Sequence, residues 1–178
     1  MSEPRLTVLG AGNALAGDDG VGAALAAALA DETLPGCVRV RAAGDPLALL
    51  EELEARRQVL LLDACRFGAR PGETCFIRLD DPEWPSLAEP LSLHGLDLST
   101  AFRLAGALGL PLDRAWLMGV EPGTIAAGVG LSPELAEAWP RVLEEARRAA
   151  LNMLDGIAPT DRSAARGDGA AALQGVDA

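Results

Sequence analysis

The chain has 178 residues, of which 49% are hydrophobic and only 3% aromatic, which is enough apolar material for one core of ordinary size. Its formal charge is −11, which disfavours nucleic acid and anionic membrane surfaces as partners, because both depend on clustered cations. No apolar run is long enough to cross a bilayer, and no apolar signal region precedes the first expected strand.

The hydrophobic pattern predicts strands and helices in alternation along the chain. Strands are expected over 5–10, 37–42, 58–62, 73–79 and 115–120. Helices are expected over 18–30, from 46, over 94–108 and over 133–154. For the helix over 94–108, which Ser92 can cap, the spacing places the core face at Ala101, Leu104, Ala105 and Leu108. Residues 80–90 contain three prolines and are expected to form a loop.

This alternation predicts an α/β fold, namely a three-layer α/β/α sandwich around a twisted sheet. The sheet is expected to have about five strands, mostly parallel, with one antiparallel strand over 73–79, where apolar and polar residues alternate. One α/β domain is expected over 1–155. The small, polar and charged composition of 156–178 predicts a disordered C-terminal tail.

The glycine-rich stretch after the first expected strand is the first candidate site. Gly10, Gly12 and Gly17 allow a close approach of the backbone, as in loops that bind nucleotides. Asp18 and Asp19 oppose that interpretation, because phosphates favour the positive N-terminus of a helix and two carboxylates there repel them. A cation or a polar substrate fits better. The structural alternative is that one aspartate, preferably Asp18, caps the helix, while the other faces the crevice.

In an open α/β sheet, ligands bind beyond the carboxyl ends of the strands, so polar residues there are candidates. Asp63 follows the apolar run Val59 to Leu62, and a carboxylate buried there is costly unless it is hydrogen-bonded or paired with a cation. It either faces the binding crevice or accepts backbone N–H groups and shapes a turn. Glu121, after the last strand, is either a turn residue or a wall of the same crevice.

His94 is the only histidine, and a lone histidine is more often an ordinary surface or core residue than a ligand. With two carboxylates, however, one imidazole completes a ligand set suited to nickel, zinc, cobalt or iron, with positions left open. Cys65 is a further candidate ligand, with a buried structural thiol as the alternative. The three cysteines are odd in number and lack zinc-site spacing, which predicts reduced thiols and a cytoplasmic location.

Several other types of site have no signature in this chain. There is no Gly-x-Ser-x-Gly, zincin or Cys-x-x-Cys pattern, and no serine or cysteine stands out as a partner for the histidine. A nucleotide-binding Rossmann-like module is the alternative from another class. Against it, the glycines do not follow Gly-x-Gly-x-x-Gly and no lysine is present to contact phosphate.

With these residues assembled, the sequence resembles the hydrogenase maturation endopeptidases over roughly residues 6–151. The resemblance rests on Gly10-x-Gly12-Asn13-x-Leu15-x-Gly17-Asp18-Asp19-Gly20-x-Gly22, on the strand into Asp63-Ala64, on Ser92-Leu93-His94, and on Gly119-Val120-Glu121-Pro122 with Gly128-Val129-Gly130-Leu131-Ser132-Pro133. The first and last motifs are specific. One stretch departs from the family, since Ala42-Ala43-Gly44-Asp45-Pro46 stands where a glycine-rich turn is usual, at a rim expected to touch substrate.

The resemblance implies an endopeptidase that removes the C-terminal extension of a nickel-loaded, nickel–iron hydrogenase large-subunit precursor during maturation. It assigns Asp19, Asp63 and His94 to metal contact, and Asp19 and Asp63 to catalysis. Nickel is expected to arrive with the precursor, so the free enzyme is expected to hold no tightly bound metal. We further expect a monomer with no nucleic acid or membrane partner.

Two chemical roles stay open for the nickel. It polarises the scissile carbonyl or a water as a Lewis acid, or it only positions the precursor beside an aspartate general base. The remaining alternative of the same fold is a non-catalytic assembly factor that only binds the precursor.

Overall fold

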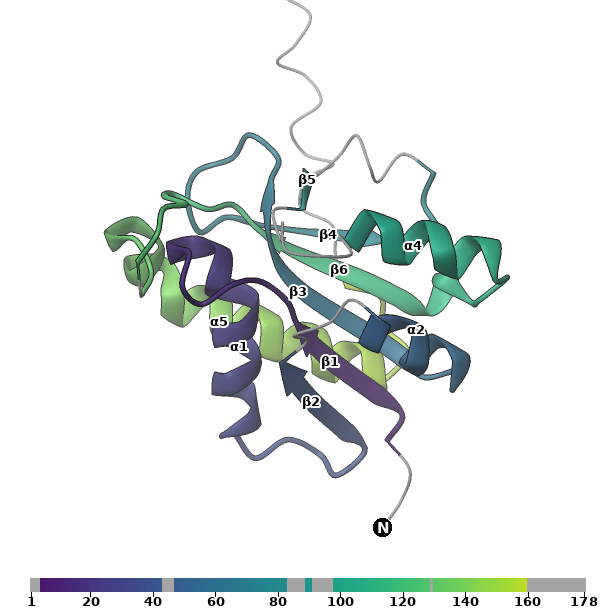
Figure 1. Cartoon of the computed structure of the whole chain (residues 1–178). Coiled ribbons are helices and arrows are strands. Elements are labelled where there is room, and N and C mark those ends of the chain that lie inside the picture. Colours follow the sequence, from purple (N-terminus) through teal and green to yellow (C-terminus); the bar gives the residue numbers. More distant parts are fainter. Residues whose placement is uncertain (1–3, 43–46, 83–88, 91–97, 129, 160–178) are drawn as a thin grey trace, which may run out of the picture.

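The computed structural model describes residues 4–42, 47–82, 89–90, 98–128 and 130–159. A central sheet lies between two layers of helices, as Figure 1 shows, which confirms the predicted three-layer α/β/α sandwich. Among the helices of these ranges, none combines the length and hydropathy needed to span a bilayer. Of the tail predicted over 156–178, only 156–159 belong to the described residues, so the predicted disorder stays a prediction.

The main sheet has the strand order β2-β1-β3-β6-β4. The strands are β1 (Leu6–Gly10), β2 (Val38–Ala42), β3 (Gln58–Arg66), β4 (Thr74–Arg78), β5 (Glu89–Pro90) and β6 (Ala115–Val120). Neighbouring strands are parallel except for β4, which pairs antiparallel with β6 at the edge, as its alternating pattern predicts. The short β5 pairs with the end of β3, so the prediction of a loop throughout 80–90 is wrong there.

Helices cover both faces of this sheet. They are the one-turn 3-10 helices η1 (Gly17–Gly20) and η2 (Leu112–Arg114), and the α-helices α1 (Val21–Ala30), α2 (Leu47–Glu54), α4 (Leu98–Ala107) and α5 (Pro133–Leu154). The helices α1 and α5 lie on one face, and α2 and α4 lie on the other (Figure 1). Ser132 caps α5 and Pro133 is its first residue, as predicted.

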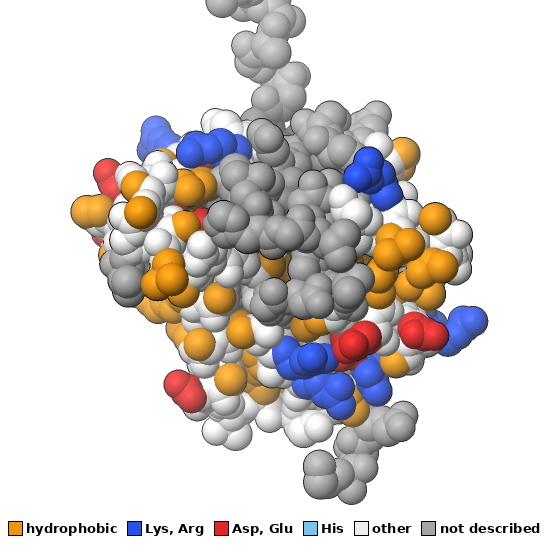
Figure 2. Space-filling model, viewed as in Figure 1, with side chains coloured by type: hydrophobic (Ala, Val, Ile, Leu, Met, Phe, Trp, Pro, Cys, Tyr) orange, Lys and Arg blue, Asp and Glu red, His pale blue; other side chains and the backbone are white. Residues whose placement is uncertain are grey.

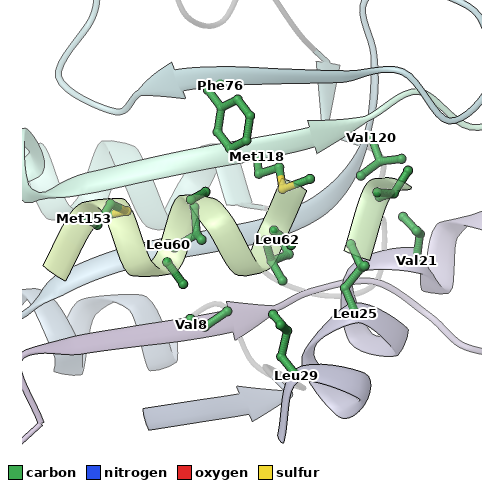
Figure 3. Close-up of a cluster of buried hydrophobic side chains, with 14 of the residues drawn as sticks. Val8, Val21, Leu25, Leu29, Leu60, Leu62, Phe76, Met118, Val120 and Met153 are labelled. Carbon is green, nitrogen blue, oxygen red and sulfur yellow. The ribbon is translucent and has the colours of Figure 1, made fainter. Parts of the chain in front are cut away.

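The core under α1 and α5 shows why the central strands read as continuous apolar runs. Val8, Leu60, Leu62 and Met118 of the sheet pack against Val21, Leu25 and Leu29 of α1 and Met153 of α5 (Figure 3). The intervening side chains, such as Leu9 and Leu61, point to the opposite face, where α2 and α4 cover them. Strands buried on both faces in this way need apolar residues at every position.

The helix α4 differs from its predicted orientation. Ala101, Phe102 and Ala105 face the sheet, whereas Leu104 and Leu108 are exposed. The prediction that the two leucines belong to the core face is therefore wrong. The aromatic ring of Phe102 occupies the place under this helix, next to two small residues, and its burial turns both leucines outward.

One buried carboxylate lies far from the predicted site. Glu52 of α2 is 1% exposed and accepts a hydrogen bond from the Thr7 hydroxyl of β1 at 2.9 Å. Its oxygens also lie 2.9 Å from Arg57, 3.2 Å from Arg41 and 3.4 Å from Arg39. Burial raises the pKa of the Glu52 carboxyl, but the hydrogen bonds from Arg57 and Thr7 and the arginine charges hold it below its ordinary value. Figure 2 shows a mixed group of blue and red side chains on the surface near β2 and α2.

We expect Glu52→Ala to lower the free energy of unfolding by about 2–4 kcal/mol, because it leaves a buried hydroxyl and three guanidinium groups without their acceptor. Urea unfolding followed by circular dichroism measures this loss. The matched control is Glu51→Ala, since Glu51 is 70% exposed and lies 3.8 Å from Arg41. A solvated pair of this kind contributes less than about 1 kcal/mol. Equal losses in the two variants would contradict a structural role for the Glu52 cluster.

Candidate active site

The sheet topology has a switch point between the carboxyl ends of β1 and β3, and this is where the predicted binding crevice is expected. From β1 the chain passes through α1 to β2 on one side, and from β2 it passes through α2 to β3 on the other side of β1. From the carboxyl end of β3 the chain goes the other way, to β4 and then through α4 to β6. The connections that leave β1 and β3 therefore diverge, and α1 and α4 lie on opposite faces of the sheet. Such a switch point is where α/β sheets of this type bind their ligands.

Asp19 lies in η1, on the β1 side of this crevice, and is 4% exposed. Its Oδ2 accepts a hydrogen bond from the Asn13 N–H at 3.0 Å. Two glycines allow the close packing, since a Cβ on Gly12, whose φ is +108°, would lie 1.8 Å from the Asp19 carbonyl oxygen. A Cβ on Gly22 would lie 2.1 Å from the Leu62 carbonyl oxygen of β3. The turn carrying Asp19 is therefore held tightly against the strand ends.

Asp63 lies on the β3 side of the crevice and is fully buried. It directly follows Leu62, the last residue of β3 that pairs with β1. The strand continues to Arg66 instead of ending at Asp63 as predicted, because its last residues pair with β6 and β5. Asp63 Oδ1 accepts the N–H of Ala64 at 2.9 Å. Asp63 thus accepts a backbone N–H but shapes no turn, and its place at the binding crevice stays a prediction.

Asp18 has a different partner from the one predicted. Its Oδ2 accepts the N–H groups of Gly123 at 2.8 Å and Thr124 at 2.9 Å, and the hydroxyl of Ser132 at 2.7 Å. Its Oδ1 accepts the Ser132 N–H at 2.6 Å. The interpretation of Asp18 as a helix cap is wrong, since neither η1 nor α1 has a side-chain cap. Asp18 instead anchors a segment more than 100 residues away to the turn that carries Asp19.

The hydrogen bonds around Asp18 also determine its charge. Burial raises the pKa of the Asp18 carboxyl, but the bonds from Ser132, Thr124 and Gly123 outweigh this effect and hold the pKa below its ordinary value. The Ser132 hydroxyl additionally accepts the Leu135 N–H at 3.4 Å as the cap of α5. A charged Asp18 therefore connects the start of α1 to the start of α5.

Two other candidates prove to be structural. Glu121 is 5% exposed, and its Oε2 accepts the N–H groups of Phe67 at 2.8 Å and Ala69 at 3.1 Å, so it fixes the turn after β3. Burial, followed by the nearby Asp63, Cys75 and Glu121, raises the pKa of the Cys65 thiol well above its ordinary value. Because metals bind the thiolate, a thiol that keeps its proton is a poor ligand, and Cys65 fits the structural interpretation.

The third residue of the predicted metal set falls outside the described residues. His94 belongs to the segment 91–97, and the rim residues Gly44 and Asp45 belong to 43–46; neither segment is described. Within the described ranges, no group of three or more His, Cys, Asp or Glu side chains could hold a metal ion. The structure thus places Asp19 and Asp63 at one switch point of the sheet, while the role of His94 stays a prediction.

The sequence does not predict the hydrogen bonds that Gly123, Thr124 and Ser132 donate to Asp18. The sequence pattern assigns Ser132 only to the cap of the last helix, and no spacing rule connects it with Asp18. The available signal was the Gly128 to Pro133 motif, which is too rich in glycine for a simple helix entry. A motif of this kind next to a second glycine-rich stretch indicates two backbones that approach each other closely.

Comparison with known proteins agrees with this fold. A family model described as hydrogenase maturation protease matches residues 25–149. The hydrogenase expression/formation protein HupD of Rhodobacter capsulatus is 32% identical over 147 residues, which cover 81% of this chain and 70% of HupD. The hydrogenase maturating endopeptidase HybD from E. coli has a similar structure, with a TM-score of 0.66 and 27% identity, covering 90% of this chain and 99% of HybD. The NiFe hydrogenase maturation protease HycI from Thermococcus kodakarensis gives a TM-score of 0.59 and 25% identity, covering 80% and 90% of the two chains.

These similarities first define the class of protein, which is a hydrolase of the peptidase type. Within that class, the chain belongs to the hydrogenase maturation protease family. The family, the enzyme class and the fold predicted from the sequence are thereby confirmed.

Proposed function

We propose that this chain removes a C-terminal extension from the large-subunit precursor of a nickel–iron hydrogenase after nickel has been inserted. Membership of the maturation protease family supports the substrate class. The observation that carries the proposal is the position of Asp19 and Asp63, two buried carboxylates from distant segments, on the two sides of the switch point.

In this proposal, nickel is part of the substrate and is held by thiolates of the precursor. Asp19, Asp63 and His94 complete its coordination with two oxygens and one nitrogen, a set suited to nickel. The fit is supported by the fixed orientation of both carboxylates, each of which accepts a backbone N–H. A resident metal would block this role, so the free enzyme holds none tightly. We further propose that the enzyme works as a monomer in the cytoplasm, without nucleic acid or membrane partners.

Peptide hydrolysis requires a proton acceptor for the attacking water and a donor for the leaving amine. One of the two carboxylates accepts the water proton as the oxygen attacks the scissile carbonyl. That proton then passes to the nitrogen of the released extension as the C–N bond breaks. Nickel either polarises the carbonyl or only holds the precursor in position, and the single variants discussed below separate these roles.

The direct test incubates the purified chain with nickel-loaded precursor and, in parallel, with metal-free precursor, and follows the released peptide by mass spectrometry. Cleavage of the loaded precursor alone is the expected result. Binding without cleavage would instead identify a non-catalytic assembly factor of the same fold. Equal cleavage of both precursors would contradict the recognition of nickel.

The nucleotide-binding alternative finds no support in the glycine-rich turn. The Asp19 carbonyl oxygen lies where a Cβ of Gly12 would be, so this glycine packs against the turn's own backbone. The charged carboxylate of Asp18 lies at the start of the same helical turn. A phosphate would meet carbonyl and carboxylate oxygens there instead of N–H groups.

A further inference from the structure

Leu15 is the most exposed large hydrophobic side chain of the described residues, at 68%. A single exposed leucine is common on protein surfaces, so exposure alone indicates nothing. What distinguishes Leu15 is its surroundings. It lies at the tip of the loop 13–17, beside the loop 124–128, and we call these two segments the loop pair.

The loop pair is cross-linked through its backbone. The Gly128 N–H donates to the Leu15 carbonyl oxygen at 3.0 Å, and the Gly17 N–H donates to the Gly128 carbonyl oxygen at 3.1 Å. The Leu15 N–H itself donates to Asn13 Oδ1 at 2.9 Å. Figure 1 shows the two segments side by side, where the chain enters α1 and where it runs from β6 to α5. Leu15 is therefore presented from an ordered backbone, which lowers the entropy lost when a partner binds.

The loop pair is also free of charge in a chain that carries a net charge of −11. Neither 6–17 nor 122–133 contains an Asp, Glu or Arg residue. The other exposed residues of the loop pair are small and uncharged, namely Ala14, Thr124, Ala126, Ala127 and Gly128. The centres of protein interfaces are depleted of charge in the same way.

This surface continues directly into the candidate active site. Asn13, which holds the Leu15 N–H through its side chain, donates its own N–H to the Asp19 carboxylate. Asp18, which follows the first loop, holds Thr124 at the start of the second. A polypeptide that reaches Asp19 from this side therefore passes over the loop pair.

We propose that the loop pair is a docking surface for a neutral, apolar segment of the precursor polypeptide, with Leu15 as its anchor. The inference rests on the proposed function, since it names the contact through which that substrate is held. Leu15 is thus an exposed apolar side chain among small, uncharged neighbours. An apolar side chain of the precursor can cover it without removing charges from water.

The test compares wild type with Leu15→Ala, Leu15→Asp and Leu15→Met in cleavage of nickel-loaded precursor. Loss of one buried leucine contact should raise KM about 10- to 100-fold in Leu15→Ala and Leu15→Asp, with kcat unchanged. Leu15→Met keeps the apolar volume and should stay near wild type. The matched control is Leu108→Asp, because Leu108 is 61% exposed and follows the end of α4. Its KM should not change.

Binding of the same precursor, measured by biolayer interferometry, provides a readout that does not need cleavage. If wild type fails to cleave but binds, and Leu15→Asp weakens binding, the proposed function fails while the docking surface stands. If wild type cleaves and Leu15→Asp has the wild-type KM and Kd, the docking surface is wrong. A wild-type dimer that Leu15→Asp converts to a monomer with unchanged KM would assign the surface to a second copy of this chain and overturn the proposal. Absence of both binding and cleavage in wild type would reject the two proposals together.

Discussion

Replacing Asp63 with asparagine should lower kcat for precursor cleavage by about 10²- to 10⁴-fold, the usual contribution of a general base or charged catalytic group. Asparagine has almost the same shape, and its side-chain oxygen can still accept the Ala64 N–H. It carries no charge and cannot accept a proton. Because Asp63 is fully buried, the neutral amide is no more costly to bury than the carboxylate, so the Tm should not fall. Steady-state cleavage and a thermal melt measure the two effects separately.

The matched control for Asp63→Asn is Glu121→Gln. Glu121 is also buried and also follows a strand at this edge, but the partners that it has among the described residues are N–H groups of the turn after β3. Its glutamine variant should keep kcat near the wild-type value. If Glu121→Gln loses as much activity as Asp63→Asn, the loss reflects the general electrostatics of this edge and not a catalytic role of Asp63.

Asp19→Asn extends the comparison to the other side of the crevice. A variant that still binds nickel-loaded precursor but does not cleave it has lost the general base. A variant that loses binding has lost a metal contact. If nickel only positions the substrate, one of the two aspartates must be the general base. In that case Asp19→Asn or Asp63→Asn should lose cleavage while it still binds the precursor.

Asp18→Ala should lower the free energy of unfolding by about 3–5 kcal/mol, because four hydrogen-bond donors lose a charged acceptor in a buried place. These donors are the N–H groups of Gly123, Thr124 and Ser132 and the Ser132 hydroxyl. Below the melting temperature, kcat/KM should fall as well, since the turn carrying Asp19 loses its anchor. Chemical unfolding measures the first effect. Asp31→Ala, at an exposed aspartate after α1, is the control and should stay close to wild type.

The pH dependence of this stability has a defined sign. The folded-state pKa of Asp18 lies below its ordinary value, so its carboxylate stabilises the fold above about pH 4, the range in which the unfolded group is ionised. That contribution is lost as the pH falls through the folded-state pKa. The stability difference between wild type and Asp18→Asn should therefore be full at pH 6 and shrink below pH 4. The pKa of Glu52 is also lowered, but Glu52 is present in both proteins. Its contribution therefore cancels in the stability difference between them. A difference that is the same at pH 6 and pH 3 would contradict a charged anchor.

The fold was predictable because its signals are local. The run Val59 to Leu62 has apolar side chains at every position, which is typical of a strand covered on both faces. Alternation over 73–79 and the Ser132-Pro133 start of the last helix are equally local signals, and both are confirmed. The position of Asp63 after the apolar run and of Asp19 after the first strand followed from the same reasoning.

The errors concern contacts between distant segments. The partners of Asp18 lie 105 to 114 residues away. The local sequence around an aspartate at the start of a helix does not show whether it caps that helix or binds a distant segment. Helical periodicity fits both the predicted face of α4 and the observed one. Only the burial of Phe102 against the sheet selects between them. The extension of β3 beyond Asp63 depends on pairing with β5 and β6, which the sequence of β3 alone does not contain.

In the proposed mechanism, Asp19 and Asp63, from opposite sides of the switch point, act as one site on one substrate. A double-mutant cycle on kcat/KM for cleavage of nickel-loaded precursor tests it, using wild type, Asp19→Asn, Asp63→Asn and the double variant. Residues that act as a unit show strongly non-additive losses. The double variant should therefore be about as slow as the slower single variant. Losses that multiply across the two substitutions would show two independent contributions and would contradict a shared site.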